Sequence, residues 1–277
     1  MDDSAASQYF HWEPHPFIFQ ISEGIGLRYY GLAYVLGFVI GGWLLKVYHD
    51  HKLSPFDKSQ RQDIFLYIIL GVALGGRLGY FLFYQPFDLI REPWVFFQIW
   101  KGGMASHGGF IGIAVTTWWI SRKFKQPFWH TADLLSSLAP AGLFLGRIAN
   151  FLNGELWGNH TAVKWAVVFT NDPTFPLRPR HPSQIYEALL EGLLLLIFTQ
   201  WRIWKTDVIL KKPGRLVGEM LLVYSLVRIF GEQFREPDAG IELTFGILSR
   251  GSTLSILMGL FAVFAIWRSN KNAPLQR

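Results

Sequence analysis

Apolar residues along the chain gather into seven blocks, which short charged segments separate. The blocks lie near residues 30–48, 64–84, 107–120, 131–147, 185–201, 216–234 and 251–267. A block of this kind can cross a hydrocarbon layer of about 30 Å as a helix, although the third block is short and rich in glycine. The pattern predicts an all-α polytopic membrane protein, in which residues 1–277 form a single integral membrane domain with seven transmembrane helices.

Composition supports the membrane class and excludes several others. The 277 residues are 51% hydrophobic and 17% aromatic, which is too apolar for an ordinary soluble domain of this length. Asp2, Asp3, Glu13 and Glu23 precede any long apolar run, so we expect no cleavable signal peptide and a mature first helix. The chain has no cysteine, which excludes disulfides, thiolate metal sites and a cysteine nucleophile.

The distribution of positive charge predicts the orientation. If the blocks are spans, 15 of the 26 Lys and Arg lie in the loops on one side and eight in the loops on the other. By the positive-inside rule, the N-terminus lies outside and the C-terminus in the cytoplasm, with the long loop 148–184 on the outer side. This bias also explains the net charge of +6, so no nucleic-acid partner is needed.

Polar side chains follow a helical spacing in blocks five and six. The residues in block six step by four, four and three, which places them on one helix face; they are Tyr224, Arg228, Glu232 and Arg235. The residues in block five step by three and four; they are Gln184, Glu187 and Glu191. Such stripes must face protein or water in a membrane.

Further polar residues lie at the outer ends of the other blocks. Tyr30 opens block one and His107 opens block three. Arg147 and Asn150 close block four, and Glu155 follows in the outer loop. We therefore expect at least three helices to turn polar faces toward a shared cavity on the outer side. Each residue also has a structural interpretation, such as an internal Arg228–Glu232 salt bridge, but membrane-embedded ionisable groups as a set usually mark a pathway or a site.

The chemistry that these residues favour is the binding and transfer of a phosphate ester. Arg147, Arg228 and Arg235 indicate an anion, and guanidinium groups suit phosphate oxygens, for which a phospholipid head group is the nearest source at the outer leaflet. His107, in the stretch HGGFIG, is a candidate base. The sequence contains no HExxH, P-loop or GxSxG motif, which leaves group transfer without a metal or cofactor.

A second pattern lies in block two. Gly71, Gly75 and Gly79 repeat every four residues, which is typical of a surface that another helix approaches closely. Arg77, in the same stretch, is open to two interpretations: it reaches the outer interface or it binds an anion.

Six motifs together resemble a known family, that of the prolipoprotein diacylglyceryl transferases. The motifs are LRYYGLAY, GGRLGYFLFY, WKGGMASHGGFIG, GRIANFLNGELWG, HPSQIYEALLEG and RIFGEQFREPD. They occur in family order over most of the chain, and GRIANFLNGELWG matches the signature run of the family. The resemblance implies seven transmembrane helices in the bacterial plasma membrane and a periplasmic-side cavity that is open to lipid. It also implies phosphatidylglycerol as donor, the lipobox cysteine of a prolipoprotein as acceptor, and release of glycerol phosphate.

The resemblance also implies a set of functional residues. The implied catalytic group is Tyr30, His107, Tyr224, Arg228 and Glu232, and the implied lipid-binding group is Arg147, Asn150, Glu155, Gly158 and Arg235. His107 is the first choice for the base that deprotonates the acceptor thiol, and Glu232, between two arginines, is the alternative. Arg228, with Arg147 or Arg235, would hold the donor phosphate.

Two departures from the family and two competing functions complete the predictions. The segment NHTAVKW follows Gly158 where a proline is expected, and Lys101 stands where an acidic or polar residue is common. A transporter would bind a translocating anion with the same arginines, but it favours an internal repeat and polar residues near the midplane. A structural or receptor-like protein would not need three arginines on facing spans.

Overall fold

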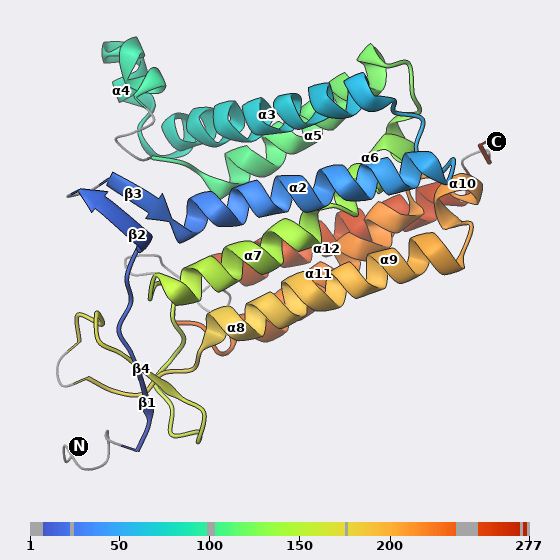
Figure 1. Cartoon of the computed structure of the whole chain (residues 1–277). Coiled ribbons are helices and arrows are strands. Elements are labelled where there is room, and N and C mark those ends of the chain that lie inside the picture. Colours follow the sequence, from blue (N-terminus) through green and yellow to red (C-terminus); the bar gives the residue numbers. More distant parts are fainter. Residues whose placement is uncertain are drawn as a thin grey trace. The chain divides into compact units, whose positions relative to one another are not determined.

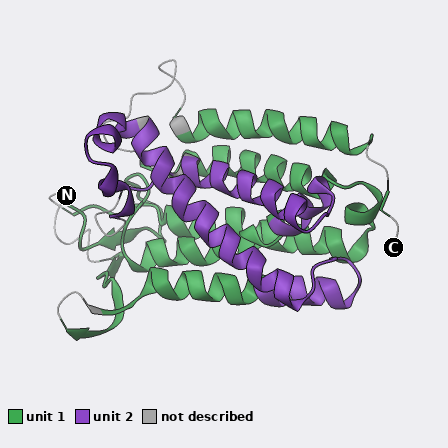
Figure 2. Ribbon diagram, turned by 90° about the horizontal axis from the view of Figure 1, so that it is seen from above, with its two compact units in different colours: residues 1–41, 136–276 green, residues 42–135, 277 purple. Residues whose placement is uncertain are grey.

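The computed structural model describes residues 8–22, 25–98, 103–174, 177–236, 249–271 and 274–275. The chain divides into two compact units, which Figure 2 shows in different colours. The first unit comprises Met1–Gly41 and Ser136–Gln276, and the second comprises Gly42–Leu135 with Arg277. The single membrane domain stays a prediction.

The described chain is mostly helical, and each apolar block of the sequence is largely helical (Figure 1). The helices are α2 Tyr29–Asp50, α3 Lys58–Tyr84, α4 Pro86–Arg91, η1 Pro93–Phe97, α5 Ser106–Lys123, α6 Phe128–Ser136, α7 Ala139–Leu152, α8 Ser183–Glu187, η3 Ala188–Leu194, α9 Leu195–Lys205, α10 Val208–Lys211, α11 Arg215–Glu232 and α12 Arg250–Ser269. Four helical stretches are long and apolar enough to cross a membrane: Tyr29–Asp50, Lys58–Leu82, Phe128–Leu152 and Gly251–Ser269. The count of seven spans stays a prediction.

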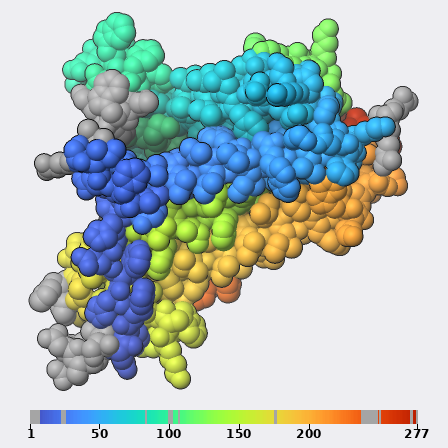
Figure 3. Space-filling view, viewed as in Figure 1, coloured from blue at the N-terminus to red at the C-terminus, as the bar shows by residue number. Residues whose placement is uncertain are grey.

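Short strands amend the all-α prediction. In the first unit, β1 Phe10–Trp12 pairs in parallel with β4 Val167–Phe169, and β2 Phe17–Ser22 forms an antiparallel ladder with β3 Ile25–Arg28. The four strands lie before the first span and in the 148–184 loop, where backbone groups find no partners within a helix. The β2–β3 ladder lies at the surface (Figure 3), where it exposes apolar side chains such as Ile21.

The fourth block is one candidate span, Phe128–Leu152, made of two helices with a turn at residues 137–138. Pro140 explains this turn, because proline has no backbone N–H to donate to the preceding turn and its ring crowds that turn. The second block begins earlier than hydropathy predicted. Asp57 and Gln60 form a capping box there, which starts α3 at the polar residue Lys58.

In the second unit, α3 and α5 pack along the predicted glycine repeat. A Cβ atom added at Gly75 would lie 2.8 Å from the Cα of Gly112, and one added at Gly79 would lie 2.6 Å from the Cα of Gly108. Side chains larger than hydrogen do not fit at these distances, so the small-residue packing surface is confirmed.

Arg77 binds backbone, a role that neither interpretation from the sequence described. It is buried, and its guanidinium donates to the backbone carbonyls of Val95, Phe96, Gln98 and Gly103 at 2.6 to 3.1 Å. It therefore holds Val95, Phe96, Gln98 and Gly103 close to α3 by donating hydrogen bonds to their carbonyl groups.

Candidate functional site

The centre of the candidate site in the first unit is a buried network of arginine and glutamate side chains. Arg147 of α7 forms ion pairs with Glu187 through Nη1 and with Glu191 through Nη2, both at 3.0 Å. Arg228 of α11 reaches the same two carboxylates through Nη1, at 2.5 Å and 3.1 Å. The side chains of Glu187 and Glu191 are 0% and 1% exposed. Two glutamates thus hold one arginine from each of two helices.

A stretch of π-helix carries one of these glutamates. Glu187 ends α8, and Glu191 lies in the π-helix η3, Ala188–Leu194, which continues directly into α9. Gly192 lets this stretch approach α7, because a Cβ at that position would lie 2.5 Å from the Cα of Phe144. The wider π-turn changes which side chains face α7, and such turns are frequent at functional sites.

The α11 residues extend this network. Arg228 also forms an ion pair with Glu232, from Nη2 to Oε2 at 2.8 Å, and Ser249 donates a hydrogen bond to the other oxygen of Glu232. Tyr224 lies one turn before Arg228 on the same helix. The predicted i, i+4 stripe on this helix is therefore present from Tyr224 to Glu232.

Arg235 corrects the prediction that block six carries all four polar residues. The helix α11 ends at Glu232, so Arg235 lies three residues beyond it. There its backbone forms an isolated antiparallel bridge with Gly158. Its Nη1 still lies 3.8 Å from Oε1 of Glu187, which brings Arg235 to the edge of the network.

A second cluster joins Tyr30, Asn150 and Glu155. Tyr30, at the start of α2, donates its hydroxyl hydrogen to Oε1 of Glu155 and accepts a hydrogen bond from Nδ2 of Asn150. Asn150 also donates to Glu155 at 3.2 Å, and Gln184 donates to the backbone carbonyl of Glu155 at 2.7 Å. Asn150 lies almost one turn after Arg147 on α7, so the two clusters share that helix.

The loop after α7 has an uncommon backbone. Gly154 has a φ of +61°, and Leu156 has a φ of +54°, in the left-handed region that branched and bulky side chains rarely adopt. Ser183 and Gln184, at the start of α8, donate to the carbonyls of Leu156 and Glu155. These bonds hold Glu155 in place against the strain at Leu156.

Gly158 lies where two segments of backbone meet. Its N–H donates to the carbonyl of His181 at 3.0 Å, and it bridges to Arg235. A Cβ at this position would lie 2.7 Å from Cβ of His181 and would contact the carbonyl oxygen of Phe234. The close packing requires glycine, whatever further part Gly158 has in lipid binding.

Arg180 supports this loop from within the first unit. Its Nε donates to Asp172 at 2.5 Å, its Nη1 donates to the carbonyl of Gly158 at 3.1 Å and lies 2.9 Å from Glu236, and its guanidinium lies over the ring of Trp157. The pKa of Asp172 lies below its usual range: burial acts to raise it, and the hydrogen bonds from Arg180 and Thr174 outweigh that effect. The pair therefore stays charged and ties the strand β4 region to the loop.

His107 belongs to the second unit. It is the second residue of α5, and its side chain is outside the described residues. Lys101, the second departure from the family pattern, is also outside them. Within the described ranges, no group of three or more His, Asp or Glu side chains could hold a metal ion.

The chain also matches known proteins over nearly its whole length. A family model described as prolipoprotein diacylglyceryl transferase matches residues 16–268. The chain belongs to the prolipoprotein diacylglyceryl transferase family. Its relatives include the phosphatidylglycerol–prolipoprotein diacylglyceryl transferases of Bradyrhizobium diazoefficiens and Rhizobium meliloti. The first is 42% identical over 90% of this chain and 91% of the relative, and the second is 41% identical over 94% of each. That of Haemophilus influenzae is 41% identical over 95% of this chain and 97% of the relative.

Sequence reasoning left two central residues of this diacylglyceryl transferase out of the site. Glu187 and Glu191 are visible as a polar stripe in block five, but neither belongs to the set of functional residues that the sequence implied. The two glutamates lie four residues apart in a strongly apolar block, and that isolation was the available signal. The sequence contains no such signal for Arg180 as the support of the loop. Its partners Asp172 and Glu236 are far from one another in the sequence.

Proposed function

We propose that this chain transfers the diacylglyceryl group of phosphatidylglycerol to the thiol of the lipobox cysteine in a prolipoprotein. The observation that carries the proposal is the buried arrangement in which Arg147 and Arg228 share Glu187 and Glu191. Membership of the transferase family supports it. The product is a thioether, and the reaction releases glycerol phosphate as the first step of lipoprotein maturation.

The reaction forms a carbon–sulfur bond and breaks a carbon–oxygen bond. The acceptor thiol has an ordinary pKa of about 8.5, so it needs a base or a positive field to become a thiolate. The thiolate attacks the C3 carbon of the diacylglyceryl group, and the electron pair of the broken bond leaves with the phosphate oxygen of glycerol phosphate. Guanidinium groups stabilise the negative charge that develops on that leaving group.

The contacts support distinct roles for the two arginines and their carboxylates. A guanidinium has five N–H donors, and Arg228 directs two of its nitrogens at Glu187, Glu191 and Glu232. The carboxylates orient the guanidiniums of Arg147 and Arg228, which bind the donor phosphate with their remaining donors. Glu232 orients Arg228, and Arg235 and Tyr224 complete the binding surface.

The second cluster shapes the wall of the site. Tyr30, Asn150 and Glu155 bind one another, so their polar atoms face the loop in a fixed arrangement. Asn150 and Glu155 position the lipid head group, and Gly158 keeps the loop close to Arg235. His107 is the base that takes the thiol proton.

The membrane arrangement is part of the proposal. Seven transmembrane helices form one domain in the bacterial plasma membrane, with the N-terminus in the periplasm and the C-terminus in the cytoplasm. The site then opens on the periplasmic side. The charge bias of the loops and the apolar helices support this arrangement.

Turnover by the purified protein tests the activity. The protein in detergent is mixed with phosphatidylglycerol and a short peptide that contains a lipobox cysteine, and the peptide is examined by mass spectrometry while glycerol phosphate is assayed. We expect a diacylglyceryl mass increase that disappears with Cys→Ser in the peptide. If the peptide stays unmodified while phosphatidylglycerol still binds, the arginine cluster is a lipid-binding or anion-binding site without transferase chemistry, and the transporter function is favoured.

A His107→Gln variant tests the proton transfer. We expect turnover to fall and the acidic limb of the pH–rate profile to change, because glutamine cannot accept the thiol proton. Near-full turnover with an unchanged profile would remove His107 from this role and favour Glu232.

A further inference from the structure

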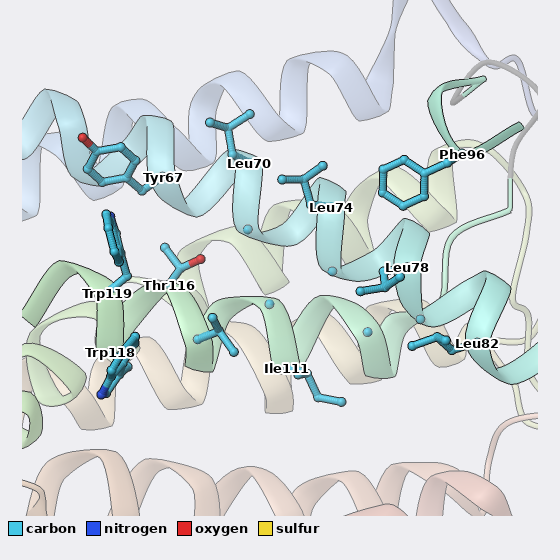
Figure 4. A pocket seen from close by; sticks show the side chains of 16 residues that line it. Tyr67, Leu70, Leu74, Leu78, Leu82, Phe96, Ile111, Thr116, Trp118 and Trp119 are labelled. Atoms are coloured by element: carbon cyan, nitrogen blue, oxygen red, sulfur yellow. The ribbon is translucent and has the colours of Figure 1, made fainter. Parts of the chain in front are cut away.

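A long apolar groove lies between α3 and α5 in the second unit, with a volume of about 560 Å³ (Figure 4). Its two ends differ. Tyr67, Trp118 and Trp119 lie at one end, and Leu82 and Phe96 lie at the other. The lining is almost entirely hydrocarbon, and the side chains along it are about half exposed, for example Leu74 at 52%. Such side chains face lipid when the helices cross a membrane.

Backbone forms part of the groove lining. Gly71, Gly75 and Gly79 of α3 face α5, and all three line the groove together with Gly108 and Gly112. The glycines bring the two helices together, so the groove is narrow along its length. The close contact at the glycines explains why a long groove, and not a wide cavity, lies between the two helices.

The dimensions of the groove select the shape of its occupant. From Tyr67 to Leu82 it runs about 22 Å at 1.5 Å per residue. The groove is open to the surroundings along one side, where the lining side chains are about half exposed. A single hydrocarbon chain, with carbons about 4 Å from their neighbours, fits lengthwise in such a narrow apolar groove.

The position of the groove in the chain points to the donor lipid. Gly108, beside the Leu82 and Phe96 end, directly follows His107, the proposed base. A lipid whose glyceryl carbon reacts near His107 would send a chain from this end toward the Trp119 end. The groove is about as long as two thirds of a ~30 Å hydrocarbon core, so one chain of an outer-leaflet lipid fits within it.

We propose that this groove binds one acyl chain of the donor phosphatidylglycerol, and that the aromatic end formed by Tyr67, Trp118 and Trp119 limits the chain length. The inference rests on the proposed transferase function and adds a determinant of donor choice to it. The second acyl chain of the donor remains in the surrounding lipid.

A matched pair of tryptophan variants tests the groove. Leu74 and Leu66 both lie on α3 and are 52% and 53% exposed, but only Leu74 lines the groove. We expect Leu74→Trp to lower kcat/KM for dipalmitoyl-phosphatidylglycerol by about tenfold or more relative to the dioctanoyl donor, because the indole blocks the path of the longer chain. Leu66→Trp should leave this ratio within about twofold of that of the wild type. Equal ratios in the two variants would overturn the proposal.

Opening the aromatic end should have the opposite effect. We expect Trp119→Ala to raise kcat/KM for donors with chains longer than palmitoyl relative to dipalmitoyl-phosphatidylglycerol, since the end wall is removed. A loss of turnover with an unchanged preference for chain length would show that Trp119 only supports packing, and it would overturn the length limit.

Crosslinking gives a readout that does not depend on turnover. Phosphatidylglycerol with a diazirine near the end of one acyl chain is irradiated with the full-length protein, and labelled peptides are mapped by mass spectrometry. We expect labels on α3 and α5 that unlabelled phosphatidylglycerol competes away and phosphatidylcholine with the same chains does not. Equal competition by both lipids, or no label on these helices, would reject the groove. A wild-type protein without turnover on any donor would instead reject the proposed function.

Discussion

Arg228 and Glu187 lie 2.5 Å apart, from Nη1 to Oε1, where α11 meets α8, and both side chains are almost completely buried. Three arginines, Arg147, Arg228 and Arg235, face three glutamates in this network, so their formal charges cancel. A lipid phosphate must therefore share the guanidiniums with carboxylates. A balanced network costs less to bury than three unpaired cations, and its geometry is fixed before substrate binds.

Replacement of Arg228 by lysine tests the geometry of the guanidinium. Arg228→Lys keeps the charge but cannot contact Glu187, Glu191 and Glu232 together, so we expect kcat/KM for phosphatidylglycerol to fall by about 10²-fold or more. The matched control is Arg215→Lys in the same helix, because Arg215 forms the equivalent i, i+4 ion pair with Glu219. Similar losses in the two variants would contradict a specific role for Arg228.

Neutralising one buried carboxylate should destabilise the protein. Glu191→Gln removes one of the carboxylates that Arg147 and Arg228 share and leaves the buried network with one uncompensated positive charge, and such a charge costs about 3–5 kcal/mol. We expect a lower Tm in detergent than for Glu219→Gln, since the side chain of Glu219 is 16% exposed and that of Glu191 is 1% exposed. Equal Tm values for the two variants would contradict the larger cost of an uncompensated charge in the buried network.

Two glycines near the site should respond differently to a methyl group. We expect Gly158→Ala to lower both turnover and Tm, because the new Cβ would contact the carbonyl of Phe234 and Cβ of His181. Gly231→Ala is the control, since no atom lies within 4 Å of a Cβ there and alanine favours a helix by about 0.5–1 kcal/mol. Full activity of Gly158→Ala would contradict the close packing of the loop.

Stability should decline in mild acid because of His181. Burial lowers the pKa of His181, so the folded protein favours the neutral imidazole and the unfolded chain takes up a proton first as pH falls. We therefore expect the Tm to drop as the pH falls below about 6.5, and to drop less in a His181→Gln variant. The pKa of His160 is also lowered, by burial and by Arg180, so the variant should keep part of the slope. Identical slopes would contradict this contribution.

Hydropathy located the helices because a membrane span must be both apolar and long. It did not predict where a helix is interrupted or begins when a single residue determines that point. Pro140 divides the fourth block, and the Asp57 capping box moves the start of α3 into polar residues. The strands β1 and β4 are each three residues long and far apart in the sequence, so periodicity could not predict their pairing.

The site was partly predictable for a similar reason. The i, i+4 spacing of Arg228 and Glu232 indicated their ion pair from the sequence alone. Contacts between helices, such as Arg147 with Glu191, depend on which faces meet, and spacing within one helix does not determine that. Leu156 has a positive φ in a loop that hydrogen bonds such as that from Ser183 hold in place. Leucine rarely adopts this conformation, so the residue type gave no sign of it.

The π-helix at Ala188–Leu194 sets the direction in which Glu187 faces, so the number of residues in this segment affects the site. A π-turn contains about one residue more than an α-turn, so removing a single residue there would rotate everything before it by about 100° relative to α9. Glu187 would turn away from Arg147 and Arg228, although the signature run GRIANFLNGELWG would remain intact. A relative with a one-residue gap in this segment would therefore keep the family signature and lose a carboxylate that joins the two arginines.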